Sequence, residues 1–255
     1  MQATRRGKTT PPYTALATGY DAVMTHVDYD VWAAYVHSLL QVHHPDPWSV
    51  LELGCGTGSL ALVLQPQGPY RYTATDGSAE MIGMARRKAT LEASPIQFEV
   101  ADFRDFRVEE PVDVVVLLYD GLNYLLEDEH VAALLRCAYD ALQPGGLFLF
   151  DQSTPANSLN NEDFFEDEGR ARNFAYTRRS HYDAATRLHT TTFALTVGAE
   201  HFHEQHVQFA YTLGEIRALV QQSPFVEIAA YNDYTQNAAT DDSERVHWIL
   251  RRPEE

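Results

Sequence analysis

The sequence predicts an α/β fold, and three observations support this. An apolar stretch runs directly into alternate glycines at Gly54, Gly56 and Gly58, as in a strand followed by a nucleotide-binding loop. Strand-like and helix-like stretches then alternate as far as residue 154, which indicates a parallel sheet with helices on both faces. Beyond that point, aromatic and β-branched residues alternate in part with polar ones, as in antiparallel strands. Together these patterns predict a Rossmann-like doubly wound sheet of seven strands, the last strand antiparallel, with a small inserted antiparallel β-sheet.

The first predicted elements are a helix and a strand. Apolar residues recur at helical spacing through residues 31–40, and residues 50–53 form the apolar strand. Because glycine lacks a Cβ, the backbone after this strand can turn sharply and approach a ligand, while the next helix presents free N–H groups. A dinucleotide-binding loop would place its third glycine where this chain has Ser59. The glycines alone therefore predict a nucleotide site and leave the choice of cofactor open.

Strands and helices continue in alternation. The strands are predicted at residues 72–76, 96–101, 112–118 and 147–151, and the helices directly after Gly58 and at 78–91 and 129–142. The stretch 112–118 is almost continuously apolar, as expected for a parallel strand buried on both faces. Pro144, Gly145 and Gly146 end the last of these helices and turn the chain into the fifth strand.

The remainder supplies an insertion and the end of the core sheet. An acidic, turn-rich segment at 160–169 precedes three predicted antiparallel strands, and a helix and a closing strand pair follow. The three strands span 174–182, 188–197 and 201–211, the helix spans 212–222, and the closing pair spans 226–234 and 246–251. The predicted division is an N-terminal helical leader (1–48), a cofactor-binding core (49–154), an inserted β lid on the substrate side (155–211), and a C-terminal helix with the closing strand pair (212–255).

The motif from Glu52 to Gly58, ELGCGTG, resembles the first motif of class I S-adenosylmethionine-dependent methyltransferases. The acidic end of the second strand, the Asp-Phe pair after the third strand and the segment after the fourth strand follow in that family's order. The whole chain resembles small bacterial methyltransferases of uncharacterised substrate. The resemblance implies S-adenosyl-L-methionine as the cofactor and S-adenosyl-L-homocysteine as its product.

The resemblance also implies a set of cofactor-binding residues. Asp76 matches the acid that accepts hydrogen bonds from ribose hydroxyls, about twenty residues beyond the glycine loop, with a helix N-cap or turn role as the alternative. Asp102 and Phe103 resemble the adenine-binding pair. Tyr13 and Tyr20 fall on one face of a predicted helix, where their phenols could reach the cofactor carboxylate or, alternatively, pack in a core. The full set is Tyr13, Tyr20, Glu52, Gly54, Gly56, Gly58, Asp76, Ser78, Met81, Asp102, Phe103 and Tyr119.

Candidate catalytic residues lie after the fourth strand and in the insertion. Tyr119 and Asn123 follow the strand at 112–118, at the edge where open α/β sheets bind ligands. In the insertion, a period of two puts Glu204 and His206 on one face of a strand. His206 could orient or deprotonate an acceptor there, and Glu204 could fix the His206 tautomer. A solvated outer face is the competing interpretation of the same pattern.

Charge and composition narrow the range of partners. The chain has 36 acidic and 19 basic residues and a formal net charge of −17, so a polyanion such as a nucleic acid would be repelled. No apolar stretch approaches the roughly 20 residues that cross a bilayer, and a cytoplasmic location without membrane contact is predicted. His201 and His203 fall opposite His206 on a strand, and no metal site is predicted.

The predicted function is methyl transfer from S-adenosylmethionine to a small-molecule acceptor, with in-line positioning of the nucleophile as the main contribution of the protein. Three alternatives share the motifs. They are a non-catalytic S-adenosylmethionine-binding protein, a methyltransferase of RNA or protein, and an NAD-dependent dehydrogenase with Ser59 in place of the last glycine. The sequence specifies neither the acceptor nor the oligomeric state.

Overall fold

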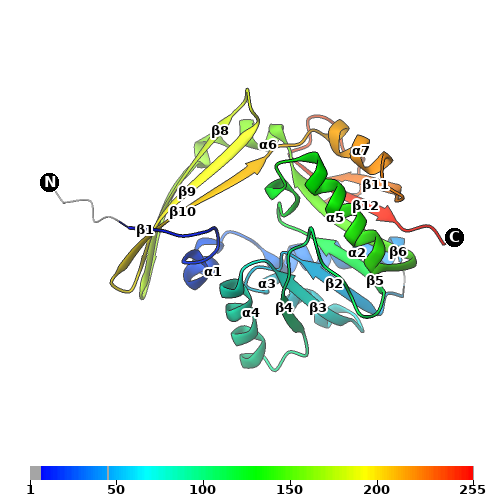
Figure 1. Cartoon of the computed structure of the whole chain (residues 1–255), viewed down its shortest axis with the longest axis horizontal. Helices are drawn as coiled ribbons and strands as arrows, with labels where there is room; N and C mark the ends of the chain where they lie inside the picture. Colours follow the sequence, from blue (N-terminus) through cyan, green and yellow to red (C-terminus); the bar gives the residue numbers. More distant parts are fainter. Residues whose placement is uncertain (1–6, 45, 255) are drawn as a thin grey trace.

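A seven-stranded sheet forms the core of the computed structural model, which describes residues 7–44 and 46–254 (Figure 1). In spatial order its strands are β11 (Val226–Asn232), β12 (Arg245–Arg251), β6 (Leu142–Ser153), β5 (Val112–Leu117), β2 (Ser49–Leu53), β3 (Arg71–Asp76) and β4 (Gln97–Val100). β12 runs antiparallel to both of its neighbours, whereas the ladder from β6 to β4 is parallel. The predicted sheet with an antiparallel last strand is therefore confirmed.

Helices cover both faces of this sheet. They are α2 (Tyr29–His43), α3 (Ser59–Leu64), α4 (Ala79–Leu91), α5 (Asp128–Ala141) and α7 (Leu213–Gln221). Apolar side chains of α2, α3 and α4 pack on one face of the sheet, and those of α5 and α7 pack on the other. Every residue of β5 is buried between the two layers. β6 begins earlier than predicted, at Leu142, because Leu142 pairs with Val112 before a register shift in the ladder.

A second, five-stranded sheet stands beside the core and is called the lid here (Figure 1). Its spatial order is β1 (Lys8–Thr9), β10 (Glu200–Phe209), β9 (Leu188–Val197), β8 (Phe174–Asp183) and β7 (Glu166–Ala171). The sequence predicted three of these strands. β7 lies in the segment expected to be turns, and it pairs Glu166 with Arg179 and Asp167 with Arg178, so that opposite charges face each other across the ladder. β1 was also missed, because a strand of two residues carries no periodicity.

The N-terminal leader is less helical than predicted. Tyr13 lies in a turn with a φ of +64°, and Tyr20 begins the single-turn helix α1 (Tyr20–Val23), so the two do not share a helix face. The rings nevertheless meet edge to face, with centroids 5.9 Å apart. Asp21 ties α1 to the core through the Thr57 hydroxyl (2.5 Å) and the Lys88 ammonium (3.0 Å).

The leader lies between the lid and the core (Figure 1). Leu16, Val23 and Met24 pack against Phe174 and Phe193 of the lid in one apolar cluster. The remaining short helices are α6 (Pro155–Asn160) and the 3₁₀ turns Leu16–Gly19, Gln65–Gln67, Leu122–Tyr124 and Glu162–Phe164. The lid is thus held to the core by packing through the leader as well as by chain connectivity.

Gly58 and Gly83 are expected to respond oppositely to alanine. Gly58 precedes α3 with a φ of +75°, and a Cβ there would lie 2.7 Å from the Phe98 ring. We expect Gly58→Ala to lower the free energy of unfolding by about 1 to 2 kcal/mol, because the left-handed conformation strains any Cβ. Gly83 lies inside α4 with open space around its Cβ position, and Gly83→Ala should raise that free energy by about 0.5 to 1 kcal/mol. Urea denaturation measures both, and equal losses would contradict this account.

Candidate cofactor and acceptor sites

A cavity of about 860 Å³ lies beside the glycine loop, at the carboxyl ends of the parallel strands, and is called the loop cavity here. Of the predicted cofactor-binding residues, all except Gly58 line it. Gly58 instead lets α3 pack closely against β4, because its Cβ position faces Phe98 and Ala85. Ser59, which replaces the last glycine of a dinucleotide loop, accepts a hydrogen bond from Lys88 (2.7 Å).

Asp76 organises the glycine loop from the end of β3. One carboxylate oxygen accepts from the Gly56 N–H (2.9 Å) and the other from the Ser78 N–H (2.7 Å). Gly54 and Gly56 both have left-handed φ values, +63° and +56°, which suit residues without a Cβ. Burial raises the pKa of Asp76 above its ordinary value, although the two N–H groups oppose this. The carboxylate is thus fixed at the cavity wall with lone pairs left for a hydroxyl-bearing ligand.

The loop cavity has both apolar and polar walls. Met81 is buried and Phe103 is partly buried, and both line the cavity. Asp102 lies at the more exposed part, where Arg104 pairs with its carboxylate (2.5 Å) and lowers the pKa of Asp102. A volume of this size accommodates a nucleoside joined to an amino acid, which fits the cofactor that the resemblance implies.

Glu52 is a buried carboxyl group in the wall of the loop cavity. It accepts a hydrogen bond from the Tyr72 hydroxyl (2.8 Å) and is 3% exposed. Burial raises the pKa of Glu52 to about 7, against the opposing effect of Tyr72. The glutamate at this position therefore holds a proton in the folded protein at pH values where it is ionised in the unfolded chain.

We expect Glu52→Gln to stabilise the protein at pH 8 by about 1 to 2 kcal/mol and to change little near pH 4.5. Because the folded pKa is raised, the folded state binds more protons than the unfolded state between the two pKa values, and the stability of the wild type falls as pH rises from about 4.5 to 7. Glutamine keeps the acceptor for Tyr72 but cannot ionise. Denaturation at several pH values measures the difference. The exposed Glu110→Gln serves as control, and parallel pH profiles for Glu52→Gln and the wild type would refute the assignment.

A second cavity of about 740 Å³, the lid cavity, lies between the core and the lid sheet. Its walls include Asp120, Asn123 and Arg245 from the core and His206 and Phe193 from the lid. The two cavities share a set of aromatic lining residues, Tyr13, Tyr20, Tyr119 and Tyr124. The two cavities therefore adjoin at these four tyrosines, which are called the tyrosine wall here.

Tyr119 stands on a strained turn at the end of β5. Both Tyr119 and Asp120 have left-handed φ values, +64° and +63°, although neither is a glycine. Arg245 pairs with Asp120 (2.6 Å) and with the fully buried Asp151, and the Asp120 N–H donates to Asp151 (3.2 Å). The Arg245 guanidinium also lies 5.5 Å from the centre of the Tyr119 ring. This ion cluster holds Tyr119 in the tyrosine wall.

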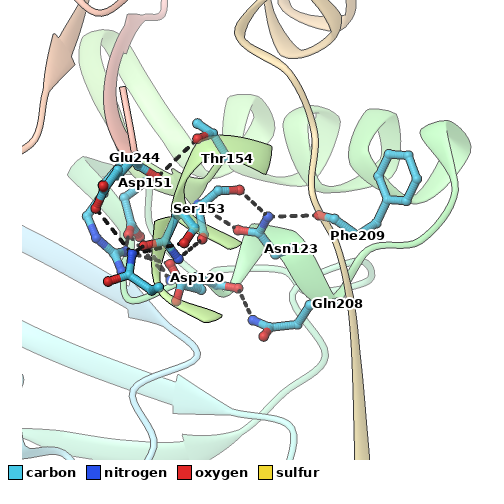
Figure 2. A network of polar contacts seen from close by, with 11 residues as sticks. Asp120, Asn123, Asp151, Ser153, Thr154, Gln208, Phe209 and Glu244 are labelled. Carbon is cyan, nitrogen blue, oxygen red and sulfur yellow. Dashed lines mark hydrogen bonds and ion pairs between the residues drawn. The ribbon is translucent and has the colours of Figure 1, made fainter. Parts of the chain in front are cut away.

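Asn123 ties the core to the lid through backbone hydrogen bonds (Figure 2). Its amide nitrogen donates to the carbonyl oxygens of Ser153 and Phe209 (2.8 Å each), and its oxygen accepts from the Ser153 N–H (3.0 Å). Gln208 makes a parallel link by donating to the Asp120 carbonyl (3.3 Å). Both amide hydrogens of Asn123 are thus used, and its side chain is 2% exposed.

His206 and Glu204 do share one face of β10, but that face is buried. Glu204 is 1% exposed and His206 is 3% exposed, so a solvated outer face is excluded. His206 Nε2 lies 3.3 Å from a Glu204 carboxylate oxygen, and His206 Nδ1 lies 3.0 Å from the Tyr124 hydroxyl. Period-two reasoning found the pair, but the contact with Tyr124 is between residues 82 positions apart and left no local signal.

Glu204 also anchors the leader, a role that sequence reasoning missed. Its carboxylate accepts from the backbone N–H groups of Tyr13 (2.8 Å), Ala15 (2.6 Å) and Leu16 (3.0 Å). Burial of Glu204 raises its pKa, but the hydrogen bonds from His206 and these N–H groups outweigh it and hold the pKa below its ordinary value. Glu204 is therefore a charged residue under the tyrosine wall.

Two further properties concern the described part of the chain. Residues 7–44 and 46–254 contain no group of three or more His, Cys, Asp or Glu side chains arranged to hold a metal ion. Within the same ranges, every helix is too short or too polar to cross a membrane.

The glycine spacing leaves the choice of cofactor open, and comparison with known proteins indicates which cofactor it is. Residues 50–146 match the family described as a methyltransferase domain. The chain is 27% identical over 245 residues to YqeM of Bacillus subtilis (strain 168), itself named only provisionally as a methyltransferase, across 94% of this chain and 97% of that protein. It is 29% identical over 220 residues to the cypemycin N-terminal methyltransferase of Streptomyces sp, across 82% and 86%. A solved S-adenosylmethionine-dependent methyltransferase from Clostridium acetobutylicum ATCC 824 shares the fold, with a TM-score of 0.78 at 19% identity over 94% and 99% of the chains.

Proposed function

Because this chain is an S-adenosylmethionine-dependent methyltransferase, we propose that it methylates a small-molecule acceptor bound in the lid cavity. The observation that supports this proposal is the shared tyrosine wall, because ligands of two adjoining cavities would lie next to each other. The lid cavity has the volume of a site for a small ligand. The net charge of −17 disfavours RNA as the acceptor.

In this proposal the loop cavity holds the cofactor. Asp76 accepts hydrogen bonds from the ribose hydroxyls, and Gly54 and Gly56 let the backbone approach the ligand. Met81 and Phe103 supply apolar contacts for the base. The cofactor, when bound, supplies a sulfonium methyl group that is already activated for transfer. The protein's own task is then to hold a nucleophile in line with that methyl group and to exclude water.

The acceptor would lie against Tyr119 and His206 in the lid cavity. We assign Tyr119 to orienting the acceptor, because its ring is held in the common wall. Asn123 is assigned to positioning, because it fastens β6 and β10 to each other. The name of the Streptomyces relative concerns methylation of an amine, which favours an amine nucleophile here as well.

A binding and turnover experiment tests the proposal. Calorimetric titration with S-adenosylhomocysteine, with NAD as control, tests the loop cavity. Release of S-adenosylhomocysteine is then measured for a panel of small amines and alcohols, beside a peptide with a free N-terminus and an RNA oligonucleotide. Turnover of small acceptors supports the proposal. Turnover of the peptide or RNA alone would overturn the small-molecule assignment, and binding without any turnover would favour a non-catalytic cofactor-binding protein.

A further inference from the structure

A continuous line of hydrogen-bonding groups runs from the lid into the tyrosine wall. Glu204 contacts His206 Nε2 at 3.3 Å, His206 Nδ1 contacts the Tyr124 hydroxyl at 3.0 Å, and the Tyr124 hydroxyl contacts the Tyr13 hydroxyl at 2.5 Å. The line begins at a buried carboxylate and ends at a phenol that lines both cavities. It connects the lid, the core and the leader.

The direction of each hydrogen bond follows from Glu204. An ionised carboxylate can only accept, so His206 Nε2 must carry a hydrogen and donate it. In the neutral ring, Nδ1 then has a lone pair and accepts from the Tyr124 O–H. The Tyr124 oxygen can in turn accept from the Tyr13 O–H. The Tyr13 oxygen keeps a lone pair, and Tyr13 lines both cavities, where the nucleophile of an acceptor would lie.

The two phenols stay protonated in this environment. Burial raises the pKa of Tyr13 and of Tyr124 well above the ordinary value of a phenol. They can therefore pass a proton along but are poor final bases, whereas a neutral imidazole beside a carboxylate is a good one. The ionisable groups that contact His206 are Glu204 from its own strand, Tyr124 from the core and Tyr13 from the leader. The ring of Phe193, from the neighbouring strand, packs against it edge to face.

We propose that Tyr13, Tyr124 and His206 form a proton relay that removes a proton from the methyl acceptor, with Glu204 stabilising the protonated imidazole. This inference rests on the proposed function and deepens it, because such a relay requires an acceptor nucleophile that carries a proton, an amine or a hydroxyl. The nucleophile's lone pair forms the bond to the methyl carbon while the carbon–sulfur bond breaks and leaves its electron pair on sulfur. The acceptor's proton moves to the Tyr13 oxygen, the Tyr13 proton to Tyr124, and the Tyr124 proton to His206 Nδ1.

The relay also depends on the docked leader. The same Glu204 oxygen that contacts His206 accepts from the Tyr13 N–H, so one carboxylate places both ends of the line. The Ser78 hydroxyl, in the wall of the loop cavity, also anchors the leader by donating a hydrogen bond to the Tyr13 carbonyl oxygen (2.9 Å). Proton removal is thereby available only when the segment that carries Tyr13 is in place.

The tautomer of His206 tests the relay without any acceptor. In the full-length protein labelled with ¹⁵N-histidine, NMR at pH 7.5 should show a hydrogen on His206 Nε2 and none on Nδ1. Tyr124→Phe should change the ¹⁵N chemical shift of His206 Nδ1, because it removes the hydrogen bond that this nitrogen accepts. The chain offers a matched control, since the Tyr70 hydroxyl contacts His37 Nδ1 at 2.7 Å outside both cavities. Tyr70→Phe should shift His37 and leave His206 unchanged. A hydrogen on Nδ1 of His206, or no response to Tyr124→Phe, would overturn the relay.

Kinetics with the best acceptor from the panel provide the second test. At pH 7, His206→Asn and Tyr124→Phe should lower kcat by roughly 10²- to 10⁴-fold, the usual contribution of general-base catalysis. The loss should shrink at high pH for an amine, which is then already neutral without help. The affinity of His206→Asn for S-adenosylhomocysteine should not change, because His206 lines the lid cavity and not the loop cavity. A constant loss at all pH values would indicate a structural role and refute the relay. If the tautomer is as expected but no acceptor turns over, the proposed function fails and not the hydrogen-bond line.

Discussion

The Asp76→Ala variant is expected to bind S-adenosylhomocysteine roughly 30- to 150-fold more weakly than the wild type, a loss of about 2 to 3 kcal/mol. Asp76 offers a charged acceptor at a fixed position in the loop cavity, and hydrogen bonds to charged groups in concave sites carry energies of this size. Alanine also frees the Gly56 and Ser78 N–H groups and loosens the loop. Calorimetric titration of the purified variant measures the affinity directly.

Asp113→Ala is the matched control for Asp76→Ala. Asp113 is also an aspartate of the core sheet, and it accepts from the backbone of Trp48 (3.0 Å) and Ser49 (2.8 Å) near the start of β5, outside both cavities. Its loss should lower the melting temperature and leave the affinity unchanged. If Asp76→Ala binds as tightly as the wild type, or if both variants lose affinity equally, Asp76 is not the ribose acceptor.

Arg245→Met should lower the free energy of unfolding by about 3 to 5 kcal/mol, because it leaves two carboxylates without their cation. Asp151 is fully buried, so water cannot replace the guanidinium there, whereas the Asp120 side chain is 20% exposed. Arg217→Met is the control. Arg217 also pairs with a carboxylate, Glu227, and lies over the Trp248 ring, but it is more exposed, and its loss should cost within about 1 kcal/mol. Urea denaturation measures both losses. Similar values for the two variants would show that burial does not determine how much these ion pairs contribute to stability.

The deficit of Arg245→Met should grow as pH rises. Burial already raises the pKa of Asp151 in the wild type, although Arg245 opposes this, and removal of Arg245 should raise the pKa further. A raised folded pKa means that stability falls as pH rises from the ordinary carboxyl value towards the folded value. The variant can protonate Asp151 at pH 5 and bury it as a neutral group. The difference from the wild type should therefore be smaller at pH 5 than at pH 8.

The core was predictable from sequence because its signals are local. A strand such as β5 is apolar throughout because both faces are covered, and the glycine loop carries its backbone requirement in the residue type itself. Residues that line the loop cavity follow strand ends directly, so their order along the chain places them. For the same reason the resemblance could assign Asp76 at the end of the second strand without any knowledge of the lid, and the structure shows its carboxylate bound to the Gly56 N–H.

The lid and the leader were less predictable because their partners are distant in sequence. The acidic strand β7 pairs with β8, where Arg178 and Arg179 face it, and β1 adds to the edge of β10. Tyr13 takes a left-handed turn where a helix was expected, because Glu204, 191 positions away, captures its N–H. The helical spacing between Tyr13 and Tyr20 cannot reveal a hydrogen bond between residues so far apart in the sequence.

The docking of the leader on Glu204 bears on the order in which ligands bind and leave. Pro11, Pro12 and Tyr13 form part of the wall of the loop cavity, and the leader that carries them is fastened to the lid. We expect an obligatory sequence in which the cofactor enters first, the leader closes, and the acceptor arrives last. In this sequence S-adenosylhomocysteine leaves only after the leader has dissociated from Glu204. Product release, and not methyl transfer, would then limit the turnover rate.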